Sequence, residues 1–309
     1  MQRASVTPPV SPHREPFPEV SALVQLLKPI TWFPPMWAFL CGAVSSGNSI
    51  VEQPLLLVLG LVLTGPLVCG ASQVVNDWFD REVDALNEPG RPIPSGRVPG
   101  RWGLYFAVIW SAVSLWVGYL LGPWVFGATL FGMLLAWAYS APPLRLKSNG
   151  WWGNAAVGLS YEGLAWVTGA AVMIGGAMPD VHVLSLALLY SLGAHGIMTL
   201  NDFKAIDGDR QMGIRSIPAQ LGPARAARLA CWTMALPQLV VIALLTVWGQ
   251  WPFALVVVAA LLAQFAAMRR LLTDPRRFAP WYNATGVTLY VLGMLASAFA
   301  LRAVAGGAA

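Results

Sequence analysis

The chain has 309 residues, of which 57% are hydrophobic and only 11% are charged. A soluble domain carries about 25% charged residues, so the composition excludes a water-soluble globule, and its high apolar content excludes a disordered chain. The net charge of +5 does not call for nucleic acid, and we expect no such partner, because basic residues of membrane proteins concentrate in cytoplasmic loops. The composition therefore indicates an all-α polytopic membrane protein.

Apolar stretches of about 20 residues, long enough to cross a bilayer as helices, recur along the chain. Turn residues such as Gly122-Pro123 separate them, and Gly65-Pro66 predicts a weak end in the second span. We expect nine spans, at residues 30–46, 54–75, 103–121, 124–140, 153–176, 183–200, 229–247, 253–270 and 282–301.

The basic residues predict the orientation of these spans. With the N-terminus inside, all 19 lysines and arginines except Arg302 fall on the cytoplasmic side, as the positive-inside rule requires. Residues 1–27 are polar and Pro-rich, so we expect a flexible cytoplasmic tail with an amphipathic stretch near 20–27. A transmembrane domain over 28–302 and a short C-terminal tail over 303–309 would follow.

An acidic motif occurs twice. Residues 76–84 follow the second span and residues 201–210 follow the sixth, and an Arg-x-Ile-Pro sequence follows each motif, at Arg91 and at Arg215. Both motifs come after an even-numbered span, so both lie on the same side of the membrane. The repeat predicts two related halves that face each other across a central cavity.

Carboxylates share a helix face in both motifs. Asp77, Asp80 and Asp84 stand at i, i+3 and i+7, and Asp202 and Asp209 are also seven residues apart. Clustered carboxylates near a bilayer repel each other unless cations neutralise them, and all-oxygen ligands suit hard cations. Two facing acidic patches rimmed by basic residues predict a site for a Mg²⁺–diphosphate complex. For either motif alone, a solvated acidic loop balanced by arginines is the alternative.

Neighbouring side chains extend this predicted metal site. Asp207 lies roughly 140° around the helix from Asp202, off the shared face. Asn76 and Asn201 can add amide carbonyls as ligands or hydrogen-bond partners. The candidate metal ligands are Asn76, Asp77, Asp80, Asp84, Asp202, Asp207 and Asp209.

A basic segment follows the fourth span. Pro142-Pro143 ends the helix in an extended turn, which would direct Arg145 and Lys147 along the rim toward the acidic patches. Arginine can hold phosphate oxygens bidentately and lysine acts as a point charge, although both residues could instead only set the topology. The candidate diphosphate-binding residues are Asn76, Arg81, Arg91, Tyr139, Arg145, Lys147, Asn201, Lys204 and Arg210.

Four residues within or beside the spans are candidates for an acceptor pocket. Glu162 is ionisable inside a span, so it either binds a polar part of a substrate or stays protonated against a neighbouring helix. His195 is a weaker candidate, since a single intramembrane histidine is more often a packing residue. Trp32 and Trp37 either line a flat aromatic pocket or belong to an interfacial belt.

The motifs together resemble those of the UbiA superfamily of intramembrane prenyltransferases, over nearly all of residues 20–300. The resemblance rests on Asn-Asp-x-x-Asp-x-x-x-Asp at 76–84 and Arg-Pro-Ile-Pro-Ser-Gly at 91–96. It also rests on Tyr-Ser-x-Pro-Pro-Leu-Arg-Leu-Lys at 139–147 and Gly-Asp-Arg-x-x-Gly at 208–213. Segments 28–39, 76–80 and 201–204 are most similar to the branch that makes chlorophylls and bacteriochlorophylls. Ala205 replaces an aspartate that many members carry, which leaves open which acids of the second motif bind metal.

The resemblance implies a nine-helix bundle around a central cavity, with a cytoplasmic cap that holds two Mg²⁺ ions. The donor would be geranylgeranyl or phytyl diphosphate, and the acceptor would be the propionate of bacteriochlorophyllide or chlorophyllide. The reaction would be the last step of pigment synthesis. The expected catalytic residues are Asp77, Asp80, Asp84, Asp202 and Asp209.

The short N-terminal segment, without an Arg/Ser-rich transit sequence, favours a bacterial protein and therefore the bacteriochlorophyll reaction. We expect it in the photosynthetic inner membrane, with its active site on the cytoplasmic side and with other pigment-synthesis or photosystem-assembly proteins as candidate partners. The alternatives are a chlorophyll synthase, a UbiA-type enzyme for an aromatic or quinone precursor, and a cation-coupled transporter.

Overall fold

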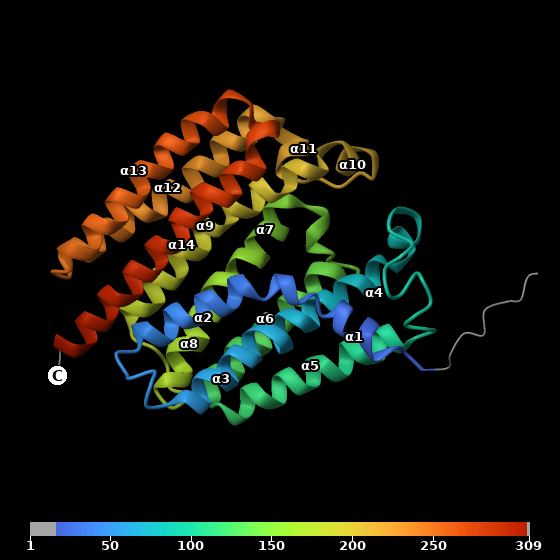
Figure 1. Ribbon diagram of the computed structural model, residues 1–309, viewed down its shortest axis with the longest axis horizontal. Helices are drawn as coiled ribbons and strands as arrows, with labels where there is room; N and C mark the ends of the chain where they lie inside the picture. The colour runs from blue at the N-terminus through green and yellow to red at the C-terminus, as the bar shows by residue number, and fades with distance from the viewer. Residues whose placement is uncertain (1–16, 308–309) are drawn as a thin grey trace, which may run out of the picture.

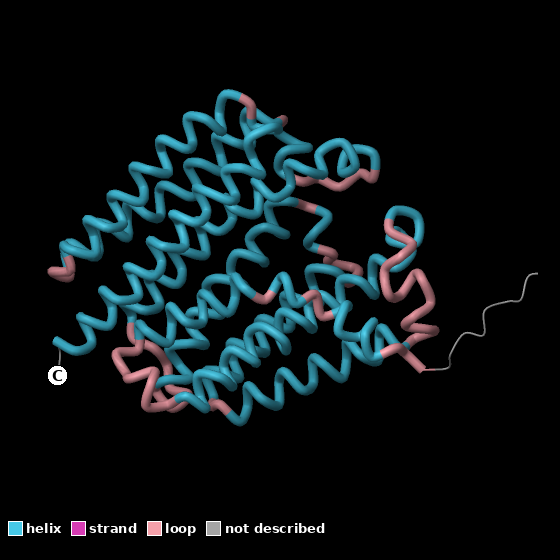
Figure 2. Tube along the Cα trace, viewed as in Figure 1, coloured by secondary structure: helices cyan, strands magenta, loops and turns pink. Residues whose placement is uncertain are grey.

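The computed structural model describes residues 17–307, so most of the expected N-terminal tail and the last two residues of the C-terminal tail lie outside the described residues. Within that range the chain folds into helices and loops without a strand (Figure 2). The elements, in chain order, are α1 (Val20–Leu26), η1 (Pro29–Thr31), α2 (Phe33–Ser45), α3 (Pro54–Val62), η2 (Leu63–Cys69), α4 (Gly70–Asn87), α5 (Trp102–Leu120), α6 (Pro123–Ser140), η3 (Leu146–Ser148), α7 (Gly150–Gly158), η4 (Leu159–Leu164), α8 (Ala165–Met173), α9 (Val181–Asn201), η5 (Asp202–Ala205), α10 (Ile206–Gln211), α11 (Ile217–Leu221), α12 (Pro223–Val247), α13 (Trp251–Thr273) and α14 (Pro275–Gly307).

Six helices of the described range are long and apolar enough to cross a membrane, which makes this a multi-pass membrane protein. They are Pro54–Asn87, Trp102–Leu120, Val181–Gln211, Pro223–Val247, Trp251–Thr273 and Pro275–Gly306. The other three expected spans coincide with α2, α6 and the segment from α7 to α8, which do not meet the same length and hydropathy criteria. The count of nine therefore stays a prediction.

The expected weak end of the second span at Gly65-Pro66 is wrong. The helix runs on from α3 through η2 into α4, and Pro66 lies inside η2, which is π-helical. A π-helical turn holds an extra residue and so accommodates the missing proline N–H without ending the helix. The first acidic motif consequently sits on the unbroken continuation of a span, as its i, i+3, i+7 spacing predicts.

Glycines allow helices of the bundle to approach closely where α2 crosses α8. A methyl group at Gly42 would lie 1.9 Å from the backbone oxygen of Trp166, and one at Gly169 would lie 2.0 Å from that of Phe39. Only glycine fits such contacts, and small residues are the usual means by which membrane helices pack. Figure 1 shows α9, α12, α13 and α14 grouped on one side and α3, α4, α5 and α6 on the other.

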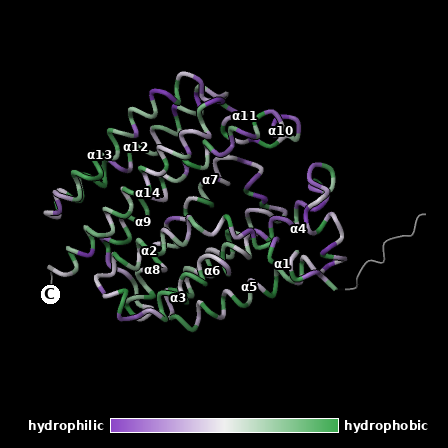
Figure 3. The backbone as a smooth tube through the Cα atoms, in the orientation of Figure 1, coloured by the Kyte–Doolittle hydropathy of each residue, from purple (hydrophilic) through white to green (hydrophobic). Residues whose placement is uncertain are grey.

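The N-terminal tail and the rim of the bundle contain ordered structure. Residues 20–26, which the sequence assigns to the tail, form α1, and Ala22 and Leu26 are buried against α4 and its surroundings. Hydrophilic residues are concentrated at the end of the bundle where α4 ends and where α10 and α11 lie (Figure 3). There the segment around Asn149 pairs with that around Arg215: Arg215 N donates to Ser148 O at 3.0 Å, and Gly150 N donates to Arg215 O at 2.8 Å.

Candidate active site

The first acidic motif lies on α4, and cations neutralise its two buried aspartates. Lys28 Nζ donates to Asp77 Oδ1 at 2.6 Å, and Arg91 Nη1 contacts Asp77 Oδ1 at 3.4 Å and Asp84 Oδ2 at 2.9 Å. Asp77 is 3% exposed and Asp84 is 7% exposed. Buried charges of this kind are tolerated only when they are paired, and here Arg91 bridges two turns of one helix face.

Asp80, on the same face of α4, forms ion pairs with the basic segment that follows α6. Arg145 Nη2 lies 3.2 Å from Asp80 Oδ1 and Lys147 Nζ lies 2.6 Å from Asp80 Oδ2. The prediction that the turn after the Pro142-Pro143 pair directs these two cations toward an acidic patch is confirmed, for the first motif. Burial lowers the pKa of the Lys147 ammonium group, and its hydrogen bond with Asp80 opposes that shift.

Lys28 is a site cation that we did not predict. It directly precedes η1, and its backbone adopts a left-handed conformation with φ 46° before Pro29. The available signal was its position just before the first apolar stretch, at the end of the chain segment that shares a side with the acidic motifs. Nothing in the spacing of residues indicates that this particular lysine meets Asp77.

The second acidic motif lies where α9 ends and the chain breaks into η5 and α10. Asn154 Nδ2 donates to Asp202 Oδ2 at 3.3 Å and also lies 3.3 Å from Thr199 Oγ1. Among the described residues no cation pairs within 4 Å with Asp202 or with the buried Asp209, although Lys204 acts on Asp202 at longer range. Within the described part of the chain, the two buried or partly buried aspartates Asp202 and Asp209 therefore lack the cation pairs that neutralise Asp77, Asp80 and Asp84.

Three predicted site residues face away from the acidic helix faces. Both carboxylate oxygens of the exposed Asp207 are bound by Arg276 at 3.1 Å, which agrees with its expected position off the shared face. Arg210 contacts a backbone carbonyl at 3.5 Å, and Arg81 stacks 4.3 Å from the ring of Trp78. The structure does not bring Arg81, Asp207 or Arg210 to the other candidates.

A largely apolar cavity of about 440 Å³ lies between the two motifs. Asn76 and Asn201, the first residues of the two motifs, both line it. Tyr139 lines it as well and interacts electrostatically with both Asp80 and Asp202. The first residue of each repeat therefore lines the same cavity, whereas the candidate aspartates are not among its lining residues.

Neighbouring polar groups position the two asparagines. Asn76 Nδ2 donates to Ser140 Oγ at 3.3 Å, and Asn201 Oδ1 accepts a hydrogen bond from Asn283 Nδ2 at 2.7 Å. Among residues 17–307 no donor binds the side-chain carbonyl of Asn76, whereas that of Asn201 already has one. Asn76 is the better placed of the two to serve as a ligand.

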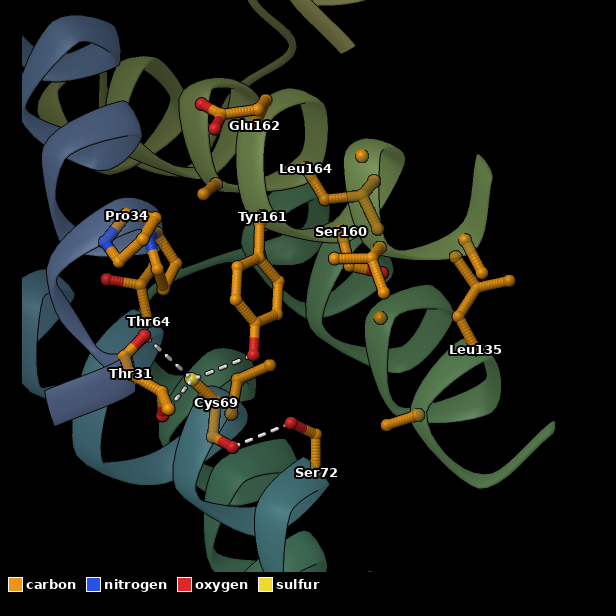
Figure 4. A pocket seen from close by; sticks show the side chains of 18 of the residues that line it. Thr31, Pro34, Thr64, Cys69, Ser72, Leu135, Ser160, Tyr161, Glu162 and Leu164 are labelled. Atoms are coloured by element: carbon orange, nitrogen blue, oxygen red, sulfur yellow. Dashed lines mark hydrogen bonds between the residues drawn. The ribbon is translucent and has the colours of Figure 1, made fainter. Parts of the chain in front are cut away.

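The two π-helical segments, η2 and η4, both contribute residues to the cavity wall and meet where Tyr161 approaches Cys69 (Figure 4). Cys69 Sγ of η2 lies 3.3 Å from the hydroxyl of Tyr161 in η4 and 3.5 Å from Thr31 Oγ1, and Gln73 Nε2 donates to the same Tyr161 hydroxyl at 3.1 Å. Isolated π-helical turns inside α-helices frequently mark functional sites. This hydrogen-bonded group was not predicted, because it depends on the register of the two π segments.

Only one of the four acceptor-pocket candidates lines the cavity, and that residue is Glu162. Trp32 and Trp37 each donate their indole N–H to a backbone carbonyl, at 2.8 Å and 3.2 Å, and pack among neighbouring helices. His195 lies 3.2 Å from a backbone carbonyl of α7. Trp32, Trp37 and His195 are not among the residues that line the cavity.

The oxygen-rich side chains near the cavity fit a hard divalent cation. In the described part of the chain no three acidic, histidine or cysteine side chains are close enough to hold an ion by themselves. Mg²⁺ does not require that, since it is usually bound through one or two carboxylates, with water and substrate phosphates as the remaining ligands. Asp80 and Asp202, which both interact electrostatically with Tyr139, can supply such carboxylates.

Comparison with known proteins identifies the family of the chain. The model of the UbiA prenyltransferase family matches residues 31–292. The bacteriochlorophyll synthase 33 kDa chain of Cereibacter sphaeroides is 60% identical over 293 residues, which cover 95% of this chain and 97% of the relative. The chloroplastic chlorophyll synthase of Arabidopsis thaliana is 39% identical, over 90% of this chain and 73% of the relative.

Solved structures share the fold. One reported for a digeranylgeranylglyceryl phosphate synthase superposes with a TM-score of 0.72 at 20% identity, over 91% of this chain and 98% of that one. A UbiA homologue from Archaeoglobus fulgidus, bound to DMAPP and Mg²⁺, superposes with a TM-score of 0.69 at 18% identity, over 89% of this chain and 99% of that one. With the family model covering most of its length, the chain belongs to the UbiA prenyltransferase family.

Proposed function

We propose that this prenyltransferase transfers a geranylgeranyl or phytyl group from its diphosphate to the propionate carboxylate of bacteriochlorophyllide, as a bacteriochlorophyll synthase does. The observation that carries the proposal is that Asn76 and Asn201, the first residues of the two acidic motifs, both line one apolar cavity. The relative in Cereibacter sphaeroides, 60% identical over nearly the whole chain, supports the choice of acceptor.

In this proposal Asp77, Asp80 and Asp84 of α4, with Asp202 and Asp209, bind divalent metal, and we infer two Mg²⁺ ions. The bound metal would neutralise the diphosphate and stabilise its developing charge as the allylic C–O bond breaks. Asp207 is excluded from the ligand set, because it is exposed and both its oxygens are bound by Arg276.

The chain's own cations would bind the diphosphate. Arg145 and Lys147 now neutralise Asp80, and Arg91 neutralises Asp77 and Asp84. With metal bound to those carboxylates, the three cations would be free to bind phosphate oxygens through charge-assisted hydrogen bonds. Tyr139 and Lys204 lie close enough to the second motif to assist, whereas Arg81 and Arg210 face elsewhere.

The cavity would shield the reacting carbon from water. Its apolar walls exclude water from the allylic cation that forms as the diphosphate departs, and the Tyr139 and Tyr161 rings that line it can stabilise positive charge. A pigment propionate is already ionised at neutral pH, so one of its oxygens can form the new ester bond without a general base. The electron pair of the broken C–O bond leaves with the diphosphate.

The topology we propose has nine spans over residues 28–302, with α1 packed against the bundle, and places the site on the cytoplasmic side of the photosynthetic inner membrane. It is supported by the basic residues that gather at the acidic end: Lys28, Arg91, Arg145 and Lys147 all contact α4 aspartates there. The loops before α5 and around α10 would form the cytoplasmic cap. Other pigment-synthesis and photosystem-assembly proteins are proposed partners.

Mass spectrometry of products tests the function. Purified protein with Mg²⁺ is offered bacteriochlorophyllide, chlorophyllide and 4-hydroxybenzoate, together with geranylgeranyl and phytyl diphosphate. We expect an ester of bacteriochlorophyllide as the main product. Prenylation of 4-hydroxybenzoate alone would overturn the choice of acceptor, and a protein that makes no prenylated product but moves labelled solute in proteoliposomes would be a transporter instead.

A further inference from the structure

A second hollow, separate from the proposed active site, lies between α12 and α13. This groove has a volume of about 490 Å³ and shares no lining residue with the cavity between the two acidic motifs. Figure 1 shows α13 at the outer edge of the bundle, with α12 beside it. Trp232 and Leu262 in its wall are 57% and 62% exposed, so the groove opens onto the surface that faces the surrounding lipid.

The groove is charged at one end and apolar along the rest. A short turn at 248–250 joins α12 to α13, so the two helices run antiparallel, and Arg228 near the start of α12 lies at the same end as Arg269 near the end of α13. Trp232 lies about 6 Å deeper than Arg228, and Leu262 about 10 Å deeper than Arg269, at 1.5 Å per residue. This gradient matches an amphiphile with a negative head group.

No acidic side chain of the described chain neutralises the two arginines. The groove has no aspartate or glutamate in its lining, and among residues 17–307 neither Arg228 nor Arg269 has a carboxylate oxygen within 4 Å. Arg228 Nε donates only to Ala224 O of its own helix, at 3.3 Å. Both guanidinium groups can therefore offer charge-assisted, bidentate hydrogen bonds to a phosphate.

The shared groove distinguishes this pair from other basic residues at the ends of membrane helices. A single arginine there extends its side chain to the lipid head groups without forming a site. Arg228 and Arg269 come from two neighbouring helices and flank one hollow that has an apolar floor. Basic pockets between membrane helices are a recurrent means of binding the head groups of acidic phospholipids.

We propose that the groove between α12 and α13 binds one anionic phospholipid, with its phosphate on Arg228 and Arg269 and an acyl chain along Trp232 and Phe265. The small side chain of Ala266, which is exposed in the groove, leaves room for that chain. The bound lipid joins α12 to α13, and α12 in turn packs against α9. The lipid thereby stabilises this side of the bundle.

Native mass spectrometry of the delipidated protein in detergent, titrated with phosphatidylglycerol, tests the site. Wild type should form a saturable one-to-one adduct, and phosphatidylcholine, whose head group also carries a positive charge, should bind about tenfold more weakly. The Arg228→Gln/Arg269→Gln variant should bind phosphatidylglycerol at least about tenfold more weakly, because charge-assisted hydrogen bonds are lost. Arg101→Gln/Arg277→Gln is the matched control, since it removes two exposed arginines that do not line the groove.

A second variant tests the acyl chain without changing the charge. Ala266→Phe fills the groove and keeps both arginines, so it should also weaken phosphatidylglycerol binding about tenfold. Thermal melting supplies an independent measure: phosphatidylglycerol should raise the Tm of wild type and not that of Ala266→Phe. Inorganic phosphate that raises the Tm of wild type equally would assign the arginines to a free anion and overturn the lipid.

Equal affinity for phosphatidylglycerol in wild type and the Arg228→Gln/Arg269→Gln variant would overturn the proposal, as would equal affinity of wild type for phosphatidylcholine. A dimer of the chain in place of the lipid adduct, lost in Ala266→Phe, would show that a second copy covers the groove instead. Should the double arginine variant fail to fold, Ala266→Phe and the choice between the two lipids decide.

Discussion

The two acidic motifs begin with the same Asn-Asp pair but are held in opposite ways. In the first, on the continuous α4, Asp77, Asp80 and Asp84 are each paired with a cation. In the second, at the break between α9 and α10, Asp202 is bound only by the amide of Asn154, and Asp209 has no cation within pairing distance among the described residues.

The difference follows from what surrounds each motif. The segment after α6 delivers Arg145 and Lys147 to α4, and Arg91 folds back onto the same helix, whereas Arg215, at the matching position of the second motif, uses its backbone to pair with the segment around Asn149. We therefore expect the second motif to govern metal affinity and the first to govern the response to diphosphate.

The largest effect should come from removing a proposed ligand on either side. Asp80→Ala and Asp202→Ala should each lower kcat at least about 100-fold, because each removes charge that acts on the departing diphosphate. Transfer from labelled prenyl diphosphate measures this, with circular dichroism and thermal melting as checks on folding. Full esterifying activity in Asp80→Ala would rule out our assignment of the first motif.

A smaller effect is expected on the Mg²⁺ concentration that the enzyme needs, and this effect should differ between the two motifs. Asn154→Ala leaves Asp202 without its amide donor and should raise the Mg²⁺ concentration for half-maximal activity about tenfold. Ser140→Ala, which removes the partner of Asn76 beside the cation-paired motif, is the matched control and should change it less. Equal shifts in the two variants would contradict the division of roles.

Lys147 should affect the donor and not the acceptor. Lys147→Ala should raise the KM for prenyl diphosphate about tenfold and leave the KM for pigment unchanged, since a phosphate contact through a charged group is lost. Because burial lowers the pKa of Lys147, its ammonium loses the proton at a lower pH than an exposed lysine would. Donor affinity should therefore fall as the pH rises, and Lys147→Arg should move that decline to higher pH. An unchanged donor KM in Lys147→Ala would argue against this role.

The smallest effect should come from the exposed pair of the second motif. Asp207→Asn breaks an ion pair with Arg276 at the surface, and such pairs contribute at most about 1 kcal/mol. Activity should stay within about twofold of wild type, measured at saturating Mg²⁺. A loss as large as that in Asp202→Ala would return Asp207 to the ligand set.

Much of the site could be predicted because it depends on local spacing. The helix face of Asp77, Asp80 and Asp84 follows from helical periodicity, and the meeting of Asn76 and Asn201 at one cavity follows from their place after even-numbered spans. The all-helical membrane fold follows from composition and length.

The rest depends on tertiary contacts. Lys28 and Asp77 are 49 residues apart in the chain, so no local sequence pattern predicts that they form an ion pair. The sequence Gly65-Pro66 predicts a helix end because proline lacks a backbone N–H donor. In the structure a π-helical turn accommodates Pro66, and the helix continues. Trp32 and Trp37 could not be separated from packing residues by type. The indole of Trp37 binds the carbonyl of Val291, far away in the chain, and that of Trp32 binds Leu27 O through the local turn before η1.

The backbone pairing of Asn149 with Arg215 fastens together the two loops that border the site. One loop carries Lys147 and the other leads back to Asp209. Because hydrogen bonds join the two loops, a shift of one is expected to shift the other. We therefore expect these two segments to keep their relative position, so that a substitution that disturbs one of them also disturbs the other.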